Sequence, residues 1–109
     1  MRVLRGAVLD VAVDVRRSSP TFGQWVAVEL TEENQVQLWI PAGFAHGFMS
    51  LADGTDVLYK TTDFWAPTAE RSIRWDDSDL ALPWPKDMAP RLAPKDAAAP
   101  LLASAEVFR

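Results

Sequence analysis

The stretch that decides the fold runs from residue 7 to residue 15 and reads Ala7-Val8-Leu9-Asp10-Val11-Ala12-Val13-Asp14-Val15. Every odd position is apolar, and two of the even positions are Asp. A period of two residues is typical of a β-strand that buries one of its faces. We therefore predict a half-buried strand whose odd positions face the core.

Working outward, strand-like patterns recur on the C-terminal side of a polar loop. Further strands are predicted at residues 24–30, 36–40, 44–51 and 55–62, with a short one at 73–75. Asp53-Gly54 supplies the positive φ that a hairpin turn needs, so the two strands beside it are expected to pair. The chain also starts directly in a strand at Val3 and Leu4, which leaves an edge open. Short strands with frequent turns predict an all-β sandwich or barrel.

The composition changes at Pro83. Five of the 8 prolines lie between Pro83 and Pro100, a spacing that neither a helix nor a central strand tolerates. We predict one domain with a β-barrel portion at residues 1–82 and an extended C-terminal strap at residues 83–109. A short helix is expected to start near Pro100 and to include Leu101, Leu102 and Ala105.

The composition also excludes several classes of function. The 109 residues contain no Cys and one His, which excludes a disulfide scaffold, a thiolate metal site and a site built from several histidines. No apolar run reaches the roughly 18 residues of a membrane span, and the N-terminus does not resemble a signal peptide. The net charge of −4 argues against nucleic-acid binding, and a cytoplasmic protein is expected.

Two side chains near the predicted hairpin are candidates for chemistry. His46 shares a strand face with Phe44 and Phe48, and it is either a core or rim histidine or an imidazole at the mouth of a barrel. Tyr59, the only tyrosine, lies on the expected neighbouring strand. Its hydroxyl either has a structural hydrogen-bond partner or donates a proton in a reaction.

The remaining polar candidates have ordinary structural explanations as well. Glu70 and Arg71 precede a charged run that is expected to be solvated, and Asp96 is either a helix cap or a surface acid. The five tryptophans are core residues by default, although one beside a pocket would stack on a flat base.

Longer motifs carry a resemblance to a known family. Pro41-x-Gly43-x-x-His46 matches part of the second cupin motif. The segments RVLRGAVLDVAVDVRRSSPTFGQWVAVEL, QLWIPAGFAHGFMSL, VLYKTTDFWAPTAERSIRWDDSDLALPWP and KDAAAPLL follow in this order. Together they resemble the dTDP-4-dehydrorhamnose 3,5-epimerase family over nearly the whole chain.

This resemblance implies a partial cupin jelly roll, a homodimer, and a reaction without metal or redox cofactor. The substrate implied is a dTDP-4-keto-6-deoxy sugar, which is inverted at C3 and C5 on the route to dTDP-L-rhamnose. In such a reaction a base removes the proton next to the ketone, polar groups stabilise the enolate, and an acid returns a proton on the opposite face.

The resemblance also assigns roles to residues. Tyr59 matches the catalytic acid, and Asp96 matches the aspartate that pairs with a catalytic histidine. His46 matches a histidine that lines the substrate site. Trp65 stands where the family usually has a second tyrosine beside the nucleotide. The remaining substrate-binding matches are Glu70, Arg71 and Lys95.

The sequence departs from the family in one important respect. The base histidine of the family lies in a block resembling RGLHFQ, upstream of the matched segments, and the 109 residues contain no such block. We therefore expect roughly the N-terminal third of a family member to be missing. Losing one member of a catalytic unit typically costs about a thousandfold or more in rate, so this chain alone is expected to be inactive or nearly so.

Other interpretations stay open. His46 would be an alternative base, but no orienting partner is identifiable near it in the sequence. The alternative functions are a non-catalytic sugar-nucleotide-binding cupin and a structural remnant that folds only with a partner. The epimerase interpretation predicts that Tyr59 and Asp96 face one common cavity.

Overall fold

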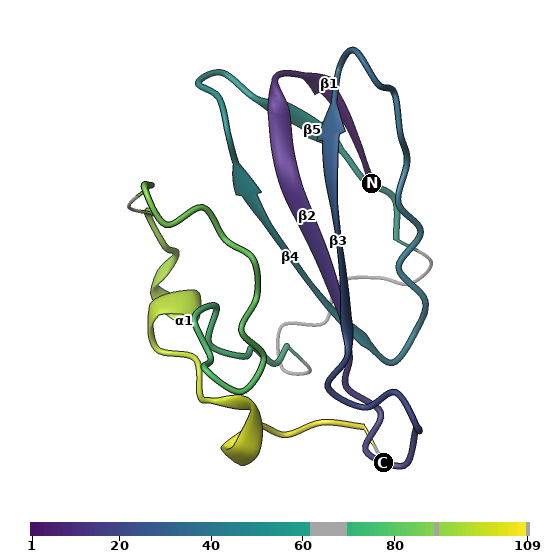
Figure 1. The fold of residues 1–109 in the computed structure, drawn as a ribbon, viewed down its shortest axis with the longest axis vertical. Coiled ribbons are helices and arrows are strands. Elements are labelled where there is room, and N and C mark those ends of the chain that lie inside the picture. The colour runs from purple at the N-terminus through teal and green to yellow at the C-terminus, as the bar shows by residue number, and fades with distance from the viewer. Residues whose placement is uncertain (62–69, 89, 109) are drawn as a thin grey trace.

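The computed structural model describes residues 1–61, 70–88 and 90–108, and it consists mainly of strands. A two-stranded sheet contains β1 (Arg2–Arg5) and β5 (Asp56–Leu58). A three-stranded sheet has the order β3-β2-β4, with β2 at Ala7–Asp14, β3 at Trp25–Thr31 and β4 at Phe44–Ser50. Figure 1 shows the small sheet lying over one end of the larger one. The predicted all-β class is confirmed.

The central strand β2 is the one that the alternating stretch predicts. It pairs antiparallel with both neighbours, for example Val11 with Ala27 of β3 and with Gly47 of β4. Residues that pair across an antiparallel sheet point to the same face. The register therefore places the β2 residue Ala12 on the same face as His46.

The two faces of β2 support two separate core clusters. On one face, Val11, Val13 and Val15 pack with Leu80 and Leu102 from the C-terminal half of the chain. On the other face, the fully buried Val8 and Leu30 pack with Val3 of β1. Because both faces of β2 are covered, the strand is buried along most of its length and not on one side only.

The burial of β2 corrects one sequence-based expectation. Asp10 is 0% exposed and Asp14 is 1% exposed, so the polar face of the predicted half-buried strand does not face solvent. The alternation is real, but each aspartate is buried against specific partners that come from other segments.

The predicted hairpin around Asp53-Gly54 is wrong in its pairing. Gly54 has the expected positive φ of 68°, so the turn itself is confirmed. However, β4 pairs with β2, while β5 is shorter than predicted and pairs with β1. Thr55 Oγ1 donates to the carbonyl of Ala52 at 2.7 Å, and the chain crosses here from one sheet to the other.

Two other predicted strands are absent from the part of the chain that the structure describes. Residues 36–40 form no strand, although Leu38 N donates to the Met1 carbonyl at 3.0 Å. Residues 73–75 form no strand either, and Arg74 N donates to the Pro100 carbonyl at 2.8 Å. In both places the apolar pattern reflects contacts of an extended segment with the core.

The C-terminal strap runs along the β4 side of the larger sheet (Figure 1). It contains a single helical turn, α1 (Pro94–Ala97), where the sequence analysis predicts extended chain. Pro94 is at the start of α1, where its missing N–H is not needed. The helix predicted from Pro100 is only a 3-10 turn at Leu102–Ser104. Among the described residues, no helix has the length and apolar character that crossing a bilayer requires.

Candidate functional site

A buried acid–imidazole pair joins β2 to β4. The Nε2–H of His46 donates to Oδ1 of Asp10. In the sheet, His46 pairs with Ala12, so Asp10 is its diagonal neighbour on the same face of β2. The side chain of His46 is 28% exposed, whereas that of Asp10 is 0% exposed. The second oxygen of Asp10 is also buried and has no hydrogen-bond partner among the described residues.

This pairing supplies an orienting partner for His46 that is not identifiable near it in the sequence, because Asp10 lies 36 residues away. A carboxylate that accepts from one ring nitrogen fixes both the tautomer and the orientation of an imidazole. With Nε2–H directed at Asp10, the other nitrogen, Nδ1, is the one that faces away from the carboxylate. The contact with Asp10 thus fixes the imidazole of His46 against β2.

A cavity of about 890 Å³ lies between the larger sheet and the C-terminal strap. His46 and Phe44 of β4 line one side of it, and Arg71, Lys95 and Asp96 line the other. Four of the site residues predicted from the sequence therefore meet in one cavity, although they come from three segments that are far apart in the chain.

Two ion pairs lie at the polar side of this cavity. Arg71 Nε donates to Glu106 Oε2 at 2.7 Å, and Lys95 Nζ donates to Glu70 Oε1 at 3.3 Å. Glu70 is thus beside the site through Lys95, while Glu106 lines the cavity itself. Cations held in this way next to a cavity suit a ligand with negatively charged oxygens.

The structure does not bring Tyr59 into the cavity. Tyr59 follows β5 and is 62% exposed, and it is not among the residues that line the space between His46 and Asp96. The expectation that Tyr59 and Asp96 share a cavity is therefore not met in this structure, and the role of Tyr59 as an acid stays a prediction. Trp65 lies outside the described residues.

A second buried aspartate fixes the loop between β2 and β3. Asp14 accepts hydrogen bonds from Arg16 Nε at 3.0 Å, from Arg16 Nη2 at 2.9 Å, from Ser19 Oγ at 2.7 Å and from the Thr21 hydroxyl. The Arg16 guanidinium, together with the hydroxyl donors, holds the pKa of Asp14 far below its usual range. The same guanidinium lies 5.1 Å from the centre of the Phe44 ring. Asp14 thereby anchors the beginning of the strand that carries His46.

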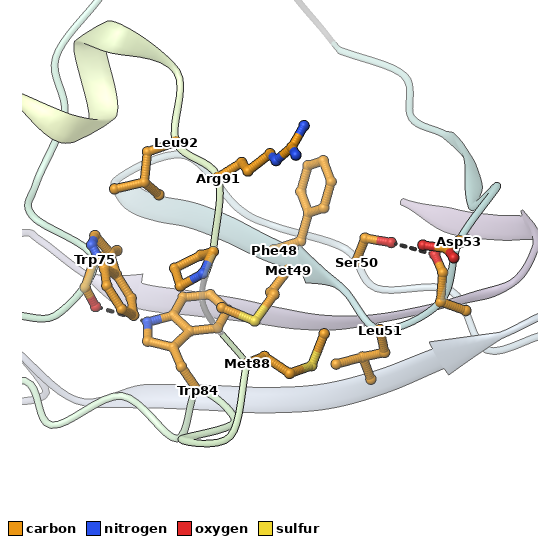
Figure 2. A pocket seen from close by; sticks show the side chains of 12 residues that line it. Phe48, Met49, Ser50, Leu51, Asp53, Trp75, Trp84, Met88, Arg91 and Leu92 are labelled. Atoms are coloured by element: carbon orange, nitrogen blue, oxygen red, sulfur yellow. Dashed lines mark hydrogen bonds between the residues drawn. The ribbon is translucent and has the colours of Figure 1, made fainter.

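A neighbouring pocket is lined mainly by aromatic and thioether side chains. It has a volume of about 700 Å³ and is lined by Met49, Trp75, Trp84, Met88 and Leu92, with Arg91 near the rim (Figure 2). Trp84 Nε1 donates to the Trp75 carbonyl at 2.7 Å, which fixes the indole between the two pockets. This pocket has fewer charged side chains than the larger cavity and offers no acid–base pair among the described residues.

Sequence reasoning missed two residues of the site. Asp10 was visible only as an aspartate in an apolar strand, and its meeting with His46 depends on the register of β2 and β4. Glu106 lies near the C-terminus and carries no motif. The sequence does carry one signal for this contact, because Asp10 and His46 are each an ionisable residue within an otherwise mostly apolar strand.

Comparisons with known proteins identify the family of the chain. The family model for dTDP-4-dehydrorhamnose 3,5-epimerase matches residues 1–104. A dTDP-4-dehydrorhamnose 3,5-epimerase from Pseudomonas aeruginosa is 55% identical over 99% of this chain and 60% of its own length. A Salmonella typhimurium protein of the same name is 54% identical over 94% of the chain and 56% of its own length.

A solved structure shows the same fold. The dTDP-6-deoxy-D-glucose-3,5-epimerase from Legionella pneumophila, in complex with dTDP-4-keto-L-rhamnose, superposes with a TM-score of 0.95 at 51% identity. The match covers 99% of this chain and 59% of that chain. The chain thus spans about 60% of the length of the relatives it matches. On the family match and these identities, the chain belongs to the dTDP-4-dehydrorhamnose 3,5-epimerase family.

Proposed function

We propose that the large cavity binds a dTDP-linked 4-keto-6-deoxy sugar and that the chain serves its epimerisation at C3 and C5. The observation that carries this proposal is the meeting of an oriented imidazole with two cations and a carboxylate in one cavity of a family member. The names of the relatives favour this function over a non-catalytic sugar-nucleotide binder.

The chemistry follows from what each group offers. Arg71 and Lys95 would meet the diphosphate oxygens, exchanging their present carboxylate partners for phosphate. His46 Nδ1 would take the proton from the carbon next to the ketone, while the C–H electrons move into the enolate and its oxygen becomes negative. The buried carboxylate of Asp10 would stabilise the imidazolium that results.

The return of a proton to the opposite face needs a second group. The resemblance gives this role to Tyr59, which the structure leaves 62% exposed and outside the cavity. The base histidine that the resemblance places upstream is also absent from the 109 residues, so His46 would have to replace it. We therefore expect the chain to exchange the substrate proton slowly, about a thousandfold or more below the rate of a full-length family member.

The test is loss of the C3 proton of the 4-keto sugar nucleotide in deuterated water, followed by NMR or mass spectrometry. The purified chain is compared with His46→Gln and with the surface variant Gln37→Ala as a matched control. We expect slow washout from the chain and from Gln37→Ala, and the buffer rate alone from His46→Gln. Equal washout from the chain and His46→Gln would refute the assignment of His46 as the base.

Binding is measured separately, by calorimetric titration with dTDP. Binding without any washout would leave the ligand class standing and would remove the acid–base role of His46. The absence of both would refute the proposed function for this chain. Washout at the rate of a full-length relative would instead overturn the expectation that the chain alone is nearly inactive.

We also propose that the protein is a homodimer. The outer edge of β3 is unpaired among the described residues. Val26 of β3 is exposed, and so are Val36 and Trp39 of the segment that follows β3. An open strand edge with apolar side chains is a ready site for pairing with another chain. Light scattering on the eluted protein checks this, and a monomer at micromolar concentration would contradict it. A cytoplasmic location stays a prediction.

A further inference from the structure

A third buried aspartate connects two segments that form walls of the cavity. Asp77 is 2% exposed and lies in the turn before Leu80. One of its oxygens accepts from the amides of Asp79 at 2.7 Å and Leu80 at 3.2 Å. Its other oxygen accepts from the amide of Leu102 at 2.6 Å, across 25 residues of sequence.

These hydrogen bonds suit a charged carboxylate. Burial by itself would raise the pKa of Asp77, but the amides of Leu102, Leu80 and Asp79 more than offset that effect and lower it. A buried carboxylate that accepts three N–H groups holds these backbone segments together strongly, because each hydrogen bond is charge-assisted.

The two segments joined by Asp77 carry the polar groups of the site. Arg71 lies upstream of Asp77 on the first segment, while Lys95 and Asp96 precede Leu102 on the second. The side chains of Leu80 and Leu102 are buried together against β2. Nearby, Arg74 N donates to the Pro100 carbonyl at 2.8 Å, which also joins these two segments.

We propose that Asp77 is a positioning residue: its carboxylate clasps the strap at Leu102 to the turn at Asp79 and Leu80, and so sets the spacing between Arg71 and the pair Lys95 and Asp96. Asp77 does not line the cavity and acts only through the backbone that it holds. The ligand in the test below rests on the proposed function, whereas the clasp itself does not.

The first experiment uses the unmodified chain. Amide NMR signals of Asp79, Leu80 and Leu102 are followed as the pH is lowered, and all three are expected to shift with one common midpoint below 3.8. Asp76 and Asp79, both exposed, are the titratable neighbours on the same segment, and residues 100–105 carry none. A Leu102 amide that does not follow the same midpoint as Leu80 would overturn the clasp.

The second experiment compares Asp77→Asn with Asp79→Asn, an exposed aspartate that gives the same change in charge. The amide side chain in Asp77→Asn would place an NH₂ group against amide donors, so either the strap or the turn loses its acceptor. Hydrogen exchange of peptides from residues 94–108 is expected to become on the order of tenfold faster in Asp77→Asn, with β2 unchanged. Asp79→Asn is expected to behave like the unmodified chain.

Titration with dTDP then links the clasp to the site. The dissociation constant is expected to rise in Asp77→Asn, because only molecules with the strap held bind at full affinity. Unchanged exchange and unchanged affinity in a folded Asp77→Asn would refute the positioning role. If the unmodified chain itself binds no dTDP, the proposed function fails, and the amide titration and exchange still decide on Asp77. If Asp77→Asn does not fold, the titration of the unmodified chain decides alone.

Discussion

Replacing His46 by alanine tests the pair on which the candidate site is built. Asp10 would keep a fully buried carboxylate and lose its one hydrogen-bond partner among the described residues. Removing one member of a buried pair typically costs about 3–5 kcal/mol, because the remaining charge is left uncompensated. Since the His46 side chain is 28% exposed, water can reach part of the vacated space, and we expect the lower end, about 3 kcal/mol.

The assay is equilibrium unfolding in urea, followed by tryptophan fluorescence. With a slope of about 2 kcal/mol per molar urea, a loss of about 3 kcal/mol lowers the midpoint by about 1.5 M. The decisive comparison is the double variant Asp10→Asn with His46→Ala. Because it no longer buries an unpaired charge, it is expected to be more stable than His46→Ala alone, by about 1–2 kcal/mol.

Two results would refute this reasoning. A midpoint for His46→Ala that stays close to that of the unmodified chain would mean that Asp10 does not depend on the imidazole. A further loss of stability on adding Asp10→Asn would mean that the carboxylate is satisfied by some other group. The surface variant Gln37→Ala, expected to lie within about 0.5 kcal/mol of the unmodified chain, controls for the effect of mutation itself.

Two more predictions concern residues that contact the end of β2 around Asp14 and Val15. Gly43 and Gly23 both have positive φ, of 89° and 81°, but a Cβ at Gly43 would lie 2.6 Å from Arg16 Cγ, whereas a Cβ at Gly23 meets nothing within 4 Å. Urea unfolding should therefore show Gly23→Ala losing about 1 kcal/mol from backbone strain, and Gly43→Ala losing clearly more because Arg16 must also move. The lowered pKa of Asp14 makes its contribution to stability present well above the ordinary value of 3.8 and progressively lost as the pH falls below that value, so the melting temperature should keep dropping on acidification below about pH 4. Asp14→Asn should flatten that drop, and an unchanged pH profile would contradict the assignment.

Local sequence patterns were sufficient to predict the strands of the larger sheet. The alternation in residues 7–15, the β-branched run after Gln24 and the run from Phe44 predict β2, β3 and β4 nearly to their ends. These strands are long enough for the period of two residues to be distinct. The motif around Pro41-x-Gly43-x-x-His46 likewise located the strand that carries the imidazole.

The same local patterns could not predict which strands pair with each other. The Asp53-Gly54 turn is compatible with a hairpin and with a crossing between sheets, because either needs a residue with positive φ. The difference lies in the pairing of β5 with β1, which is a contact across more than 50 residues. Leu38 shows the same limit: its apolar alternation reflects packing against the Val3 cluster without a strand.

Some residues of the candidate site were predictable from local motifs, and others depend on the pairing of strands. His46, Arg71, Lys95 and Asp96 were identified from motifs, and the cavity brings them together. Asp10 was not identified, since its contact with His46 exists only when β2 and β4 adopt one particular register. Shifting that register by one residue would turn Asp10 to the opposite face.

The three buried aspartates show why a polar residue in an apolar strand is ambiguous. Asp14 is satisfied by a guanidinium and hydroxyls, and Asp77 by three backbone amides, so each has a complete structural role. Asp10 differs, because one of its oxygens binds an imidazole while the other is buried with no partner among the described residues. Buried polar atoms are nearly always paired, so an exception needs a reason. Asp10 joins the cavity-lining imidazole of His46 to β2, whereas the two saturated aspartates hold the backbone around the cavity.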